Sequence, residues 1–363
     1  MKRIGINMSH YNVMWWYWVV ATNIVNELLK LDDYEFYLFN NKDFSLPDEY
    51  SSKKNVHKVV TKANNYIFYR LFTQWKLIKK YNIQTFYTPD QIVPLKKHCK
   101  YISTIHDLYD YSKYSWFRAF YYFYSMWFKW WLRVFLYHFL PLDKIFAKKS
   151  DYIVTPSTNS KNEIMKFFGV KSDKIIVSYW WIDHMEEYDL IDDSKEYVLF
   201  PLSDCYCSNY LAFRIWKEIM KNNLIENVYY WKPWWMKYEK FKQFENEKWF
   251  IISNKRLTEE EKFNLIKNAK CCIYISLFEW FWFVPLEVLK IWTPLIYRKV
   301  CSLGEVVGDA WLWITSDNVK DYLRSLGEIL GDSGYSNELI KNGKIRSNKF
   351  TRRQTVKNFI EKL

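Results

Sequence analysis

The chain has 363 residues and a net charge of +13, which suits an anionic partner such as a nucleotide diphosphate, an acidic membrane surface or a nucleic acid. Its six scattered cysteines lack paired CxxC spacing, which argues against a disulfide scaffold and against a metal site. The longest apolar region, 114–140, carries too many charged residues to span a bilayer, and the first residues do not read as a signal peptide. We therefore expect a protein of the reducing cytoplasm.

Strand-like and helix-like runs alternate through the first half of the chain. The expected strands are 3–7, 35–40, 57–61, 84–88, 101–105, 151–157 and 174–179, and the expected helices include 19–29, 65–81 and 157–168. This alternation is typical of a parallel sheet with crossover helices.

A polar, acidic stretch over 184–196 separates this half from a second series of the same kind. The expected strands there are 197–202, 227–231, 249–253, 271–276 and 294–298, and the expected helices are 209–222, 258–269, 285–291 and 318–330. The predicted organisation is an N-terminal Rossmann-like domain over 1–183, a linker over 184–196, a C-terminal Rossmann-like domain over 197–345, and a helix over 346–363 that packs back on the first domain. The predicted fold class is α/β.

The turn between the first strand and the first helix reads WWYW, with Trp15, Trp16 and Trp18. Nucleotide-binding α/β proteins usually have glycine at this turn, because backbone amides must approach a phosphate. The whole chain has 20 Trp and only 8 Gly, whereas about 7% Gly is usual. These numbers suggest that many tryptophans stand at glycine positions.

Seven residues separate two carboxylates, Glu279 and Glu287, the first after an expected strand and the second in the first turn of the next expected helix. The positive end of a helix dipole is a suitable place for binding a nucleotide diphosphate beside its sugar hydroxyls. Without further context, Glu287 is more often a charge that stabilises a helix N-terminus than a ligand-binding residue.

The region 276–314 resembles the E-x7-E region of family 4 retaining glycosyltransferases, which have the GT-B fold of two Rossmann-like domains with parallel sheets facing a central cleft. The family pattern reads approximately S-L-x-E-G-F-G-x-x-x-L-E, then G-x-P-[VL]-I, then P-E-V-x-G-D-A-G. The segment STIHDLYDY, with His106 and Asp107, resembles the family's T-x-H-D-L segment. The resemblance covers nearly the full chain.

Tryptophan stands at the family's glycines in several separate segments: 15, 16, 18, 181, 231, 234 or 235, 280, 282, 292 and 311. An indole at that many positions would cost more in backbone strain than the stability of a domain. We therefore expect that the gene uses UGA codons for glycine and that these were translated as Trp. Trp75 and Trp216, at apolar helix positions, are expected to be true tryptophans.

The resemblance implies a role for each matching residue. Glu287 binds the ribose hydroxyls of the donor nucleotide; Glu279 lies near the transferred sugar or the leaving phosphate; and His106 faces the donor sugar. The remaining donor-binding residues are Trp15, Trp16 and Trp18 in the first loop, Trp280, Phe281, Trp282 and Phe283 in the loop after Glu279, and Asn209 and Lys232. The family needs no metal and no cofactor other than the nucleotide-diphosphate sugar, its co-substrate.

One departure from the family concerns the diphosphate. Family members usually carry an Arg/Lys pair after the first strand of the second domain, where this chain has Cys207 and Ser208. Lys232, Arg256 and Arg298 are the candidates to replace it. The expected function is transfer of a sugar to a glycan or a lipid-linked acceptor in cell-surface polysaccharide synthesis; the alternative is a degenerate GT-B protein that binds a glycan or a partner without transfer.

Three further alternatives stay open at this point. Without the family, His106 is more simply a structural histidine of the core. Segment 114–140 is either a buried helix pair or a basic, aromatic face that lies on the inner membrane surface. A nucleic-acid partner is not expected, because no recognition motif accompanies the basic charge.

Overall fold

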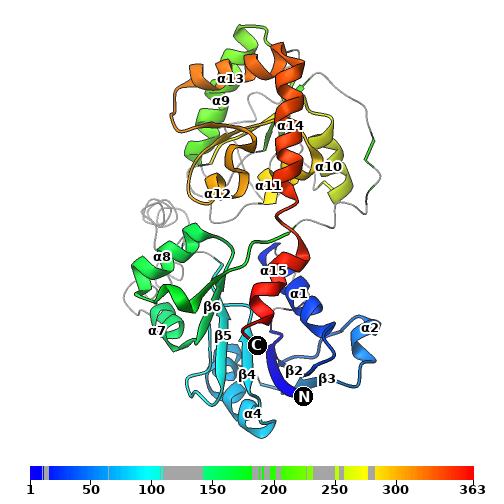
Figure 1. The fold of residues 1–363 in the computed structure, drawn as a ribbon, viewed down its shortest axis with the longest axis vertical. Helices are drawn as coiled ribbons and strands as arrows, with labels where there is room; N and C mark the ends of the chain where they lie inside the picture. The colour runs from blue at the N-terminus through cyan, green and yellow to red at the C-terminus, as the bar shows by residue number, and fades with distance from the viewer. Residues whose placement is uncertain are drawn as a thin grey trace. The chain divides into compact units, whose positions relative to one another are not determined.

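The structure is a computed structural model of the 363-residue chain, and it describes residues 1–9, 11, 16–63, 65–106, 108, 142–181, 188, 190–191, 197–201, 206–225, 227–231, 250–252, 257–276 and 283–363. For 16–19, 206–209, 231 and 250–252 it describes the backbone alone. The chain forms two compact units: one comprises Met1–Trp180 with Arg353–Leu363, the other Trp181–Arg352 (Figure 1). Each unit is described by itself below.

The first unit contains a seven-stranded sheet with the order β3-β2-β1-β4-β5-β6-β7, and all its strand pairs are parallel. The strands are β1 (Lys2–Asn7), β2 (Tyr34–Asn40), β3 (Val56–Val60), β4 (Thr85–Thr88), β5 (Lys100–Thr104), β6 (Tyr152–Thr155) and β7 (Ile175–Val177). Central strands such as β4 are buried along their length, which explains their continuous apolar runs. All seven strands predicted for this half are confirmed.

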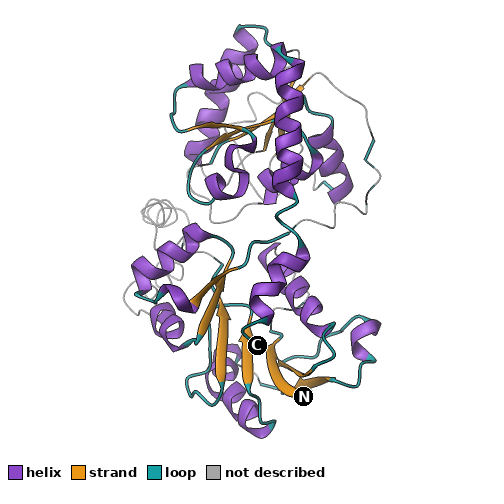
Figure 2. Cartoon of the chain, viewed as in Figure 1, coloured by secondary structure: helices purple, strands orange, loops and turns teal. Residues whose placement is uncertain are grey.

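Helices connect these strands on both faces of the sheet (Figure 2). They are α1 (Trp16–Leu29), α2 (Asp48–Ser51), α3 (Tyr66–Phe68), the π-helical turn η1 (Tyr69–Thr73), α4 (Gln74–Lys80), α7 (Leu142–Lys149), α8 (Thr158–Phe168) and the 3₁₀ turn η3 (Ser172–Lys174). Ser157 caps α8 by accepting a hydrogen bond from the amide of Ser160, and Gly169 ends it with φ +66°. Local signals thus set both ends of this helix.

The second unit contains a six-stranded parallel sheet with the order β10-β9-β8-β11-β12-β13. Its strands are β8 (Tyr197–Pro201), β9 (Asn227–Trp231), β10 (Phe250–Ile252), β11 (Cys271–Tyr274), β12 (Leu295–Arg298) and β13 (Leu312–Ile314). The first five were predicted. The sixth, β13, has only three residues and pairs with β12 at the sheet edge.

The helices of this unit are α9 (Tyr206–Lys221), α10 (Glu259–Lys267), α11 (Phe283–Ile291), α12 (Leu303–Val307), the 3₁₀ turn η6 (Gly308–Ala310), α13 (Val319–Gly331) and α14 (Ser333–Ser347). Helix α11 packs against α10 and α14, whereas α9 packs against α13 (Figure 1). Right-handed crossovers account for this division, because β8–α9–β9 and β11–α11–β12 run in opposite directions across the sheet.

The last helix, α15 (Arg352–Ile360), packs within the first unit. The Phe359 ring lies 4.7 Å from that of Tyr87 between centroids, and the hydroxyl of Ser178 donates to the carbonyl of Thr355 at 2.6 Å. The prediction that one helix begins at 346 and continues to 363 was wrong about where the helix begins. Helix α14 continues through Ser347, and the chain then bends with Phe350 buried before α15 begins.

Candidate functional site

Polar side chains gather where the central strands of the first unit end. In doubly wound sheets, ligands bind outside the carboxyl ends of the strands. Asn7 is the last residue of β1, Thr88 is the last of β4, and His106 follows β5 by two residues; all three are buried. The candidate site of this unit therefore lies at this edge.

His106 is held by the chain segment that follows β4. Its Nε2 lies 2.8 Å from the carbonyl oxygen of Pro89, and its ring centroid lies 5.6 Å from that of Trp180. A carbonyl only accepts hydrogen bonds, so Nε2 carries a proton; when the ring is neutral, Nδ1 is then the acceptor nitrogen. With 8% of its surface exposed, His106 sits in the edge of the core rather than in solvent.

A buried ion pair supports the same segment. Arg70, in the π-helical turn η1, donates from Nη1 to Oδ2 of Asp90 and from Nη2 to Oδ1, both at 2.6 Å. Nη2 also donates to the hydroxyl of Thr88 and to the carbonyl of Ile92. Burial by itself lowers the pKa of the guanidinium, but the charge of Asp90 outweighs it and the pKa of Arg70 is raised.

This network reaches the end of β1. The side-chain amide of Asn7 donates to the hydroxyl of Thr88 at 3.4 Å, and Oδ1 of Asn7 accepts from the side-chain amide of Gln74 at 2.7 Å. The amide of Thr104 donates to the carbonyl of Asp90. The ion pair thus ties together the ends of β1, β4 and β5, where His106 lies.

In the second unit, Glu287 is the predicted site residue that the structure describes in full. It lies in α11, which follows β11, and only 3% of its surface is exposed. It is the fifth residue of α11, one turn beyond the helix start and not in the first turn as predicted, in the helix that follows the carboxyl end of β11. The burial was not expected from a residue predicted to meet a ligand.

A lysine that the sequence did not single out explains how the charge of Glu287 is accommodated. Lys262 of α10 donates from Nζ to Oε1 of Glu287 at 2.8 Å and to Oε2 of Glu259 at 2.7 Å. Burial lowers the pKa of Lys262, but the two carboxylates outweigh this and the net pKa is raised. One signal was available: Lys262 lies four residues before the buried Ile266, on the inner face of α10.

Other predicted residues have a known position but fewer described features. Trp16 and Trp18 were predicted in a loop and lie instead in the first turn of α1, which begins earlier than expected; the first amides of a helix still lack partners within it. Phe283 is the first residue of α11, and Asn209 lies in α9. Trp15, Lys232, Glu279, Trp280, Phe281 and Trp282 lie outside the described residues.

Arg298 was one candidate to replace the missing Arg/Lys pair. It ends β12, and its Nη1 lies 2.7 Å from Oδ1 of Asp317. Its charge is thus already compensated within the unit. The other two candidates, Lys232 and Arg256, lie outside the described residues, as does segment 114–140.

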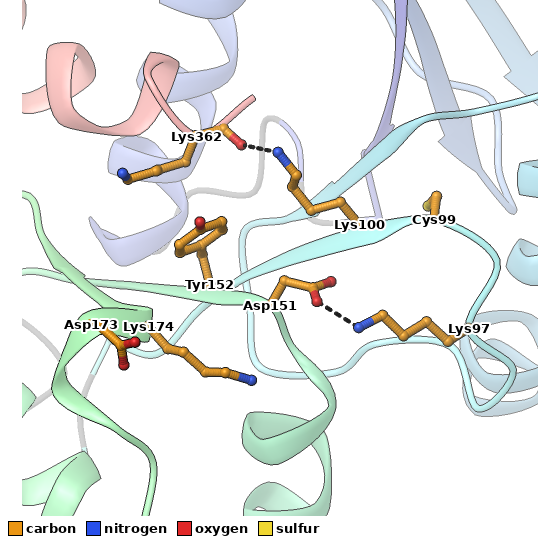
Figure 3. Close-up of a pocket in the computed structure, with 8 residues that line it drawn as sticks. All are labelled: Lys97, Cys99, Lys100, Asp151, Tyr152, Asp173, Lys174 and Lys362. Atoms are coloured by element: carbon orange, nitrogen blue, oxygen red, sulfur yellow. Dashed lines mark hydrogen bonds and ion pairs between the residues drawn. The ribbon is translucent and has the colours of Figure 1, made fainter.

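A basic hollow lies at the opposite, amino-terminal edge of the first sheet (Figure 3). Its lining residues are Lys97, Cys99, Lys100, Asp151, Tyr152, Asp173, Lys174 and Lys362. Within it Lys97 pairs with Asp151 at 2.6 Å, and Lys100 donates to the carbonyl of Lys362 at 3.1 Å. Its location at the starts of β5 and β6 separates it from His106.

The described part of the chain has neither a metal-binding cluster nor a membrane-spanning helix. No group of three or more His, Cys, Asp or Glu side chains is arranged to hold a metal ion there. None of the helices described there has the length and apolar character needed to cross a membrane.

Comparison with known proteins adds a family and a fold. Residues 18–186 match the family described as Glycosyltransferase Family 4, and no curated protein matches the chain. A glycosyltransferase from Rickettsia africae is similar over 99% of this chain and 97% of its own, with a TM-score of 0.67 and 13% identity. Sucrose-phosphate synthase from Thermosynechococcus elongatus is similar over 100% of this chain and 98% of its own, with a TM-score of 0.66 and 12% identity.

HepE from Anabaena, solved in complex with UDP-glucose, is similar over 100% of this chain and 99% of its own, with a TM-score of 0.66 and 11% identity. At these identities the likeness concerns the fold. It confirms the predicted α/β class with two Rossmann-like units of parallel strands.

Proposed function

We propose that the protein transfers a sugar from a nucleotide-diphosphate donor to a glycan or lipid-linked acceptor, with retention of configuration. The proposal is supported by the match of residues 18–186 to glycosyltransferase family 4 and by the fold that the chain shares with glycosyltransferases. The acceptor is proposed to be a cell-surface polysaccharide or its precursor. UDP-glucose is the first donor to test, since HepE was solved with it.

The observation that carries the proposal is the buried carboxylate of Glu287 at the carboxyl edge of a parallel sheet. A carboxylate accepts hydrogen bonds from vicinal hydroxyls, and the amides at the start of α11 suit the negative charge of a diphosphate. Oε1 of Glu287 bonds Lys262, so Oε2 remains for a ribose hydroxyl. In the first unit, Nδ1 of His106 suits a hydroxyl of the transferred sugar when the ring is neutral.

The proposed step is a front-face displacement. The acceptor oxygen forms a bond to the anomeric carbon as the bond from that carbon to the diphosphate oxygen breaks, and the acceptor proton passes to the leaving diphosphate. Preorganised donors around the diphosphate stabilise the charge that develops on it. Glu279 and the segment 280–283 are proposed to lie beside the sugar, and the first loop with Trp15, Trp16 and Trp18 beside the diphosphate or the acceptor.

A second candidate is a GT-B protein that binds a glycan without transferring sugar. It is favoured by Cys207 and Ser208 at the place of the family's Arg/Lys pair, and by Arg298 being engaged with Asp317. A weakened diphosphate site would reduce donor affinity before it affected any acceptor site.

The test is a donor assay on two forms of the protein, one as written and one with Gly at the ten family positions listed above. UDP release and glycan products are measured with UDP-glucose and other nucleotide sugars, and the anomeric configuration of the product is read by NMR. We expect transfer by the glycine form, and loss of about 10²-fold in kcat for His106→Ala. The exposed Lys320→Met serves as the matched control and should leave the rate unchanged.

The two candidates give different results. Nucleotide binding without any transfer, in both forms and with several acceptors, would favour the glycan-binding protein. Absence of nucleotide binding in both forms would contradict the proposed transferase.

A further inference from the structure

Glu287 carries a buried oxygen whose hydrogen-bonding capacity is unused. Oε2 has no hydrogen-bond partner among the described residues and is shielded from water, whereas Oε1 accepts from Lys262 at 2.8 Å. Leaving a buried carboxylate oxygen unsatisfied is costly, and such atoms in native proteins call for an explanation. A ligand hydroxyl that donates to Oε2 would remove the cost.

Lys262 fixes which oxygen stays open. Its Nζ is held between Oε1 of Glu287 and Oε2 of Glu259, and it lies 4.6 Å from the centroid of the Phe263 ring. The side chain is 11% exposed, and that of Glu287 is 4% exposed, so the pair is shielded from water on both sides. Three contacts restrict the ammonium group to one position, and this in turn restricts the rotation of the carboxylate.

Lys262 also supplies the positive charge beside this buried carboxylate. An ammonium group that donates to one carboxylate oxygen engages that oxygen and leaves the other for a further donor. Among the described residues, Lys262 is the cation within hydrogen-bond distance of Glu287.

We infer that Lys262 is a positioning residue of the donor site, which holds Oε1 of Glu287 so that Oε2 accepts a ribose hydroxyl of the nucleotide. This inference rests on the proposed function, because it assigns the nucleotide to Glu287. Lys262 itself contacts no sugar or phosphate in this assignment; its effect passes through Glu287.

The experiment measures how strongly the protein distinguishes a ribose from a ribose without hydroxyls. UDP, GDP and ADP are first compared by calorimetry, and the tightest is then measured beside its 2′,3′-dideoxy analogue. For the wild type we expect the analogue to bind about 10- to 100-fold more weakly, since a hydrogen bond to a charged group is involved. The ratio of the dissociation constants of the analogue and the nucleotide should fall in Lys262→Met to about the value of Glu287→Gln, and Lys262→Arg should retain most of it.

Further variants separate positioning from loss of structure. Adding Lys262→Met to Glu287→Gln should leave the ratio at the Glu287→Gln value, because Lys262 then has no carboxylate to orient. Lys262→Gln, which keeps a donor but no charge, replaces Lys262→Met if the latter does not fold, and it should also lower the ratio. Thermal unfolding of each variant and the exposed control Lys320→Met, with an unchanged ratio, complete the set.

The possible failures are distinct. A wild type that binds none of the three nucleotides contradicts the proposed function and this inference together. A wild type that binds with a large ratio, beside a folded Lys262→Met or Lys262→Gln with the same ratio, leaves the proposed function standing and overturns the role of Lys262.

Discussion

Both units bury one carboxylate beside one cation at the edge of a parallel sheet, but the two carboxylates are used differently. Asp90 accepts four hydrogen bonds: two from Arg70, one from the hydroxyl of Thr88 and one from the amide of Ile92. Glu287 accepts one described hydrogen bond, from Lys262. The first carboxylate is saturated by the protein, and the second retains capacity for a ligand.

This difference indicates that one carboxylate supports the fold of a site and that the other is available to bind a ligand. Asp90 fixes the loop whose Pro89 carbonyl holds His106, so it supports the site without contacting a ligand. Glu287 offers an oxygen directly. A buried ion pair therefore indicates a ligand site only when the hydrogen-bond capacity of its members is incompletely used.

The largest expected effect comes from breaking the saturated pair. Arg70→Met removes the cation and leaves Asp90 buried with two of its four hydrogen bonds lost. We expect the free energy of unfolding to fall by about 3–5 kcal/mol, measured by urea denaturation. A loss below about 1 kcal/mol would show that the network is not the support described above.

A smaller effect is expected at the open pair. In Glu287→Gln, Lys262 keeps its bond to Glu259, so only part of its charge compensation is lost. We expect the free energy of unfolding to fall by about 1–2 kcal/mol, while nucleotide binding weakens at least tenfold. Equal stability losses at Arg70 and Glu287 would break the contrast between the two carboxylates.

The helix that carries Glu287 provides the next prediction. Helix α11 ends in a left-handed residue, Trp292, with φ +69°, and the amide of Thr293 donates to the carbonyl of Val288. Helix α8 of the first unit ends in the same conformation, but with Gly169. A non-glycine residue in this conformation costs about 1–2 kcal/mol, and Trp292 regains part of it through the ammonium of Lys344, 3.7 Å from its ring centroid.

We therefore expect Trp292→Gly to raise the free energy of unfolding by about 1 kcal/mol, and the matched change Gly169→Ala to lower it by a similar amount. Both are measured by urea denaturation. The hypothesis that UGA encodes glycine predicts a UGA codon at 292, and UGG codons at 75 and 216. A UGG codon at 292, together with a stability loss in Trp292→Gly, would contradict the hypothesis at this position.

The smallest expected effect concerns α10, which carries Lys262. Thr258 and Glu261 form a capping box, in which Thr258 Oγ1 accepts from the amide of Glu261 and Oε2 of Glu261 accepts from the amide of Thr258. Thr258→Ala should lower the free energy of unfolding by about 0.5–1 kcal/mol. The ratio of the dissociation constants of the 2′,3′-dideoxy analogue and the nucleotide should stay at the wild-type value. A fall in this ratio would mean that the helix end, rather than the ion pair, orients Glu287.

Much of this molecule could be read from local sequence patterns. Twelve strand runs and the helices over 157–168 and 258–269 were predicted, because burial on both sheet faces and apolar residues at helical spacing leave marks within a few residues. Strand β13 was missed, since three residues carry no period. The start of α1 was also missed, because Trp16 and Trp18 were assigned to a glycine-rich loop instead of to the helix.

The position of His106 just after β5 and that of Glu287 in the helix after β11 followed from the sequence for the same reason. What only the tertiary structure decided is which groups their neighbours bring to them. Lys262 lies 25 residues before Glu287 and Arg70 lies 20 before Asp90, so neither pair leaves a periodic signal. Packing of α10 on α11 and the π-helical turn η1 create these contacts, and they set which carboxylate is closed and which is open.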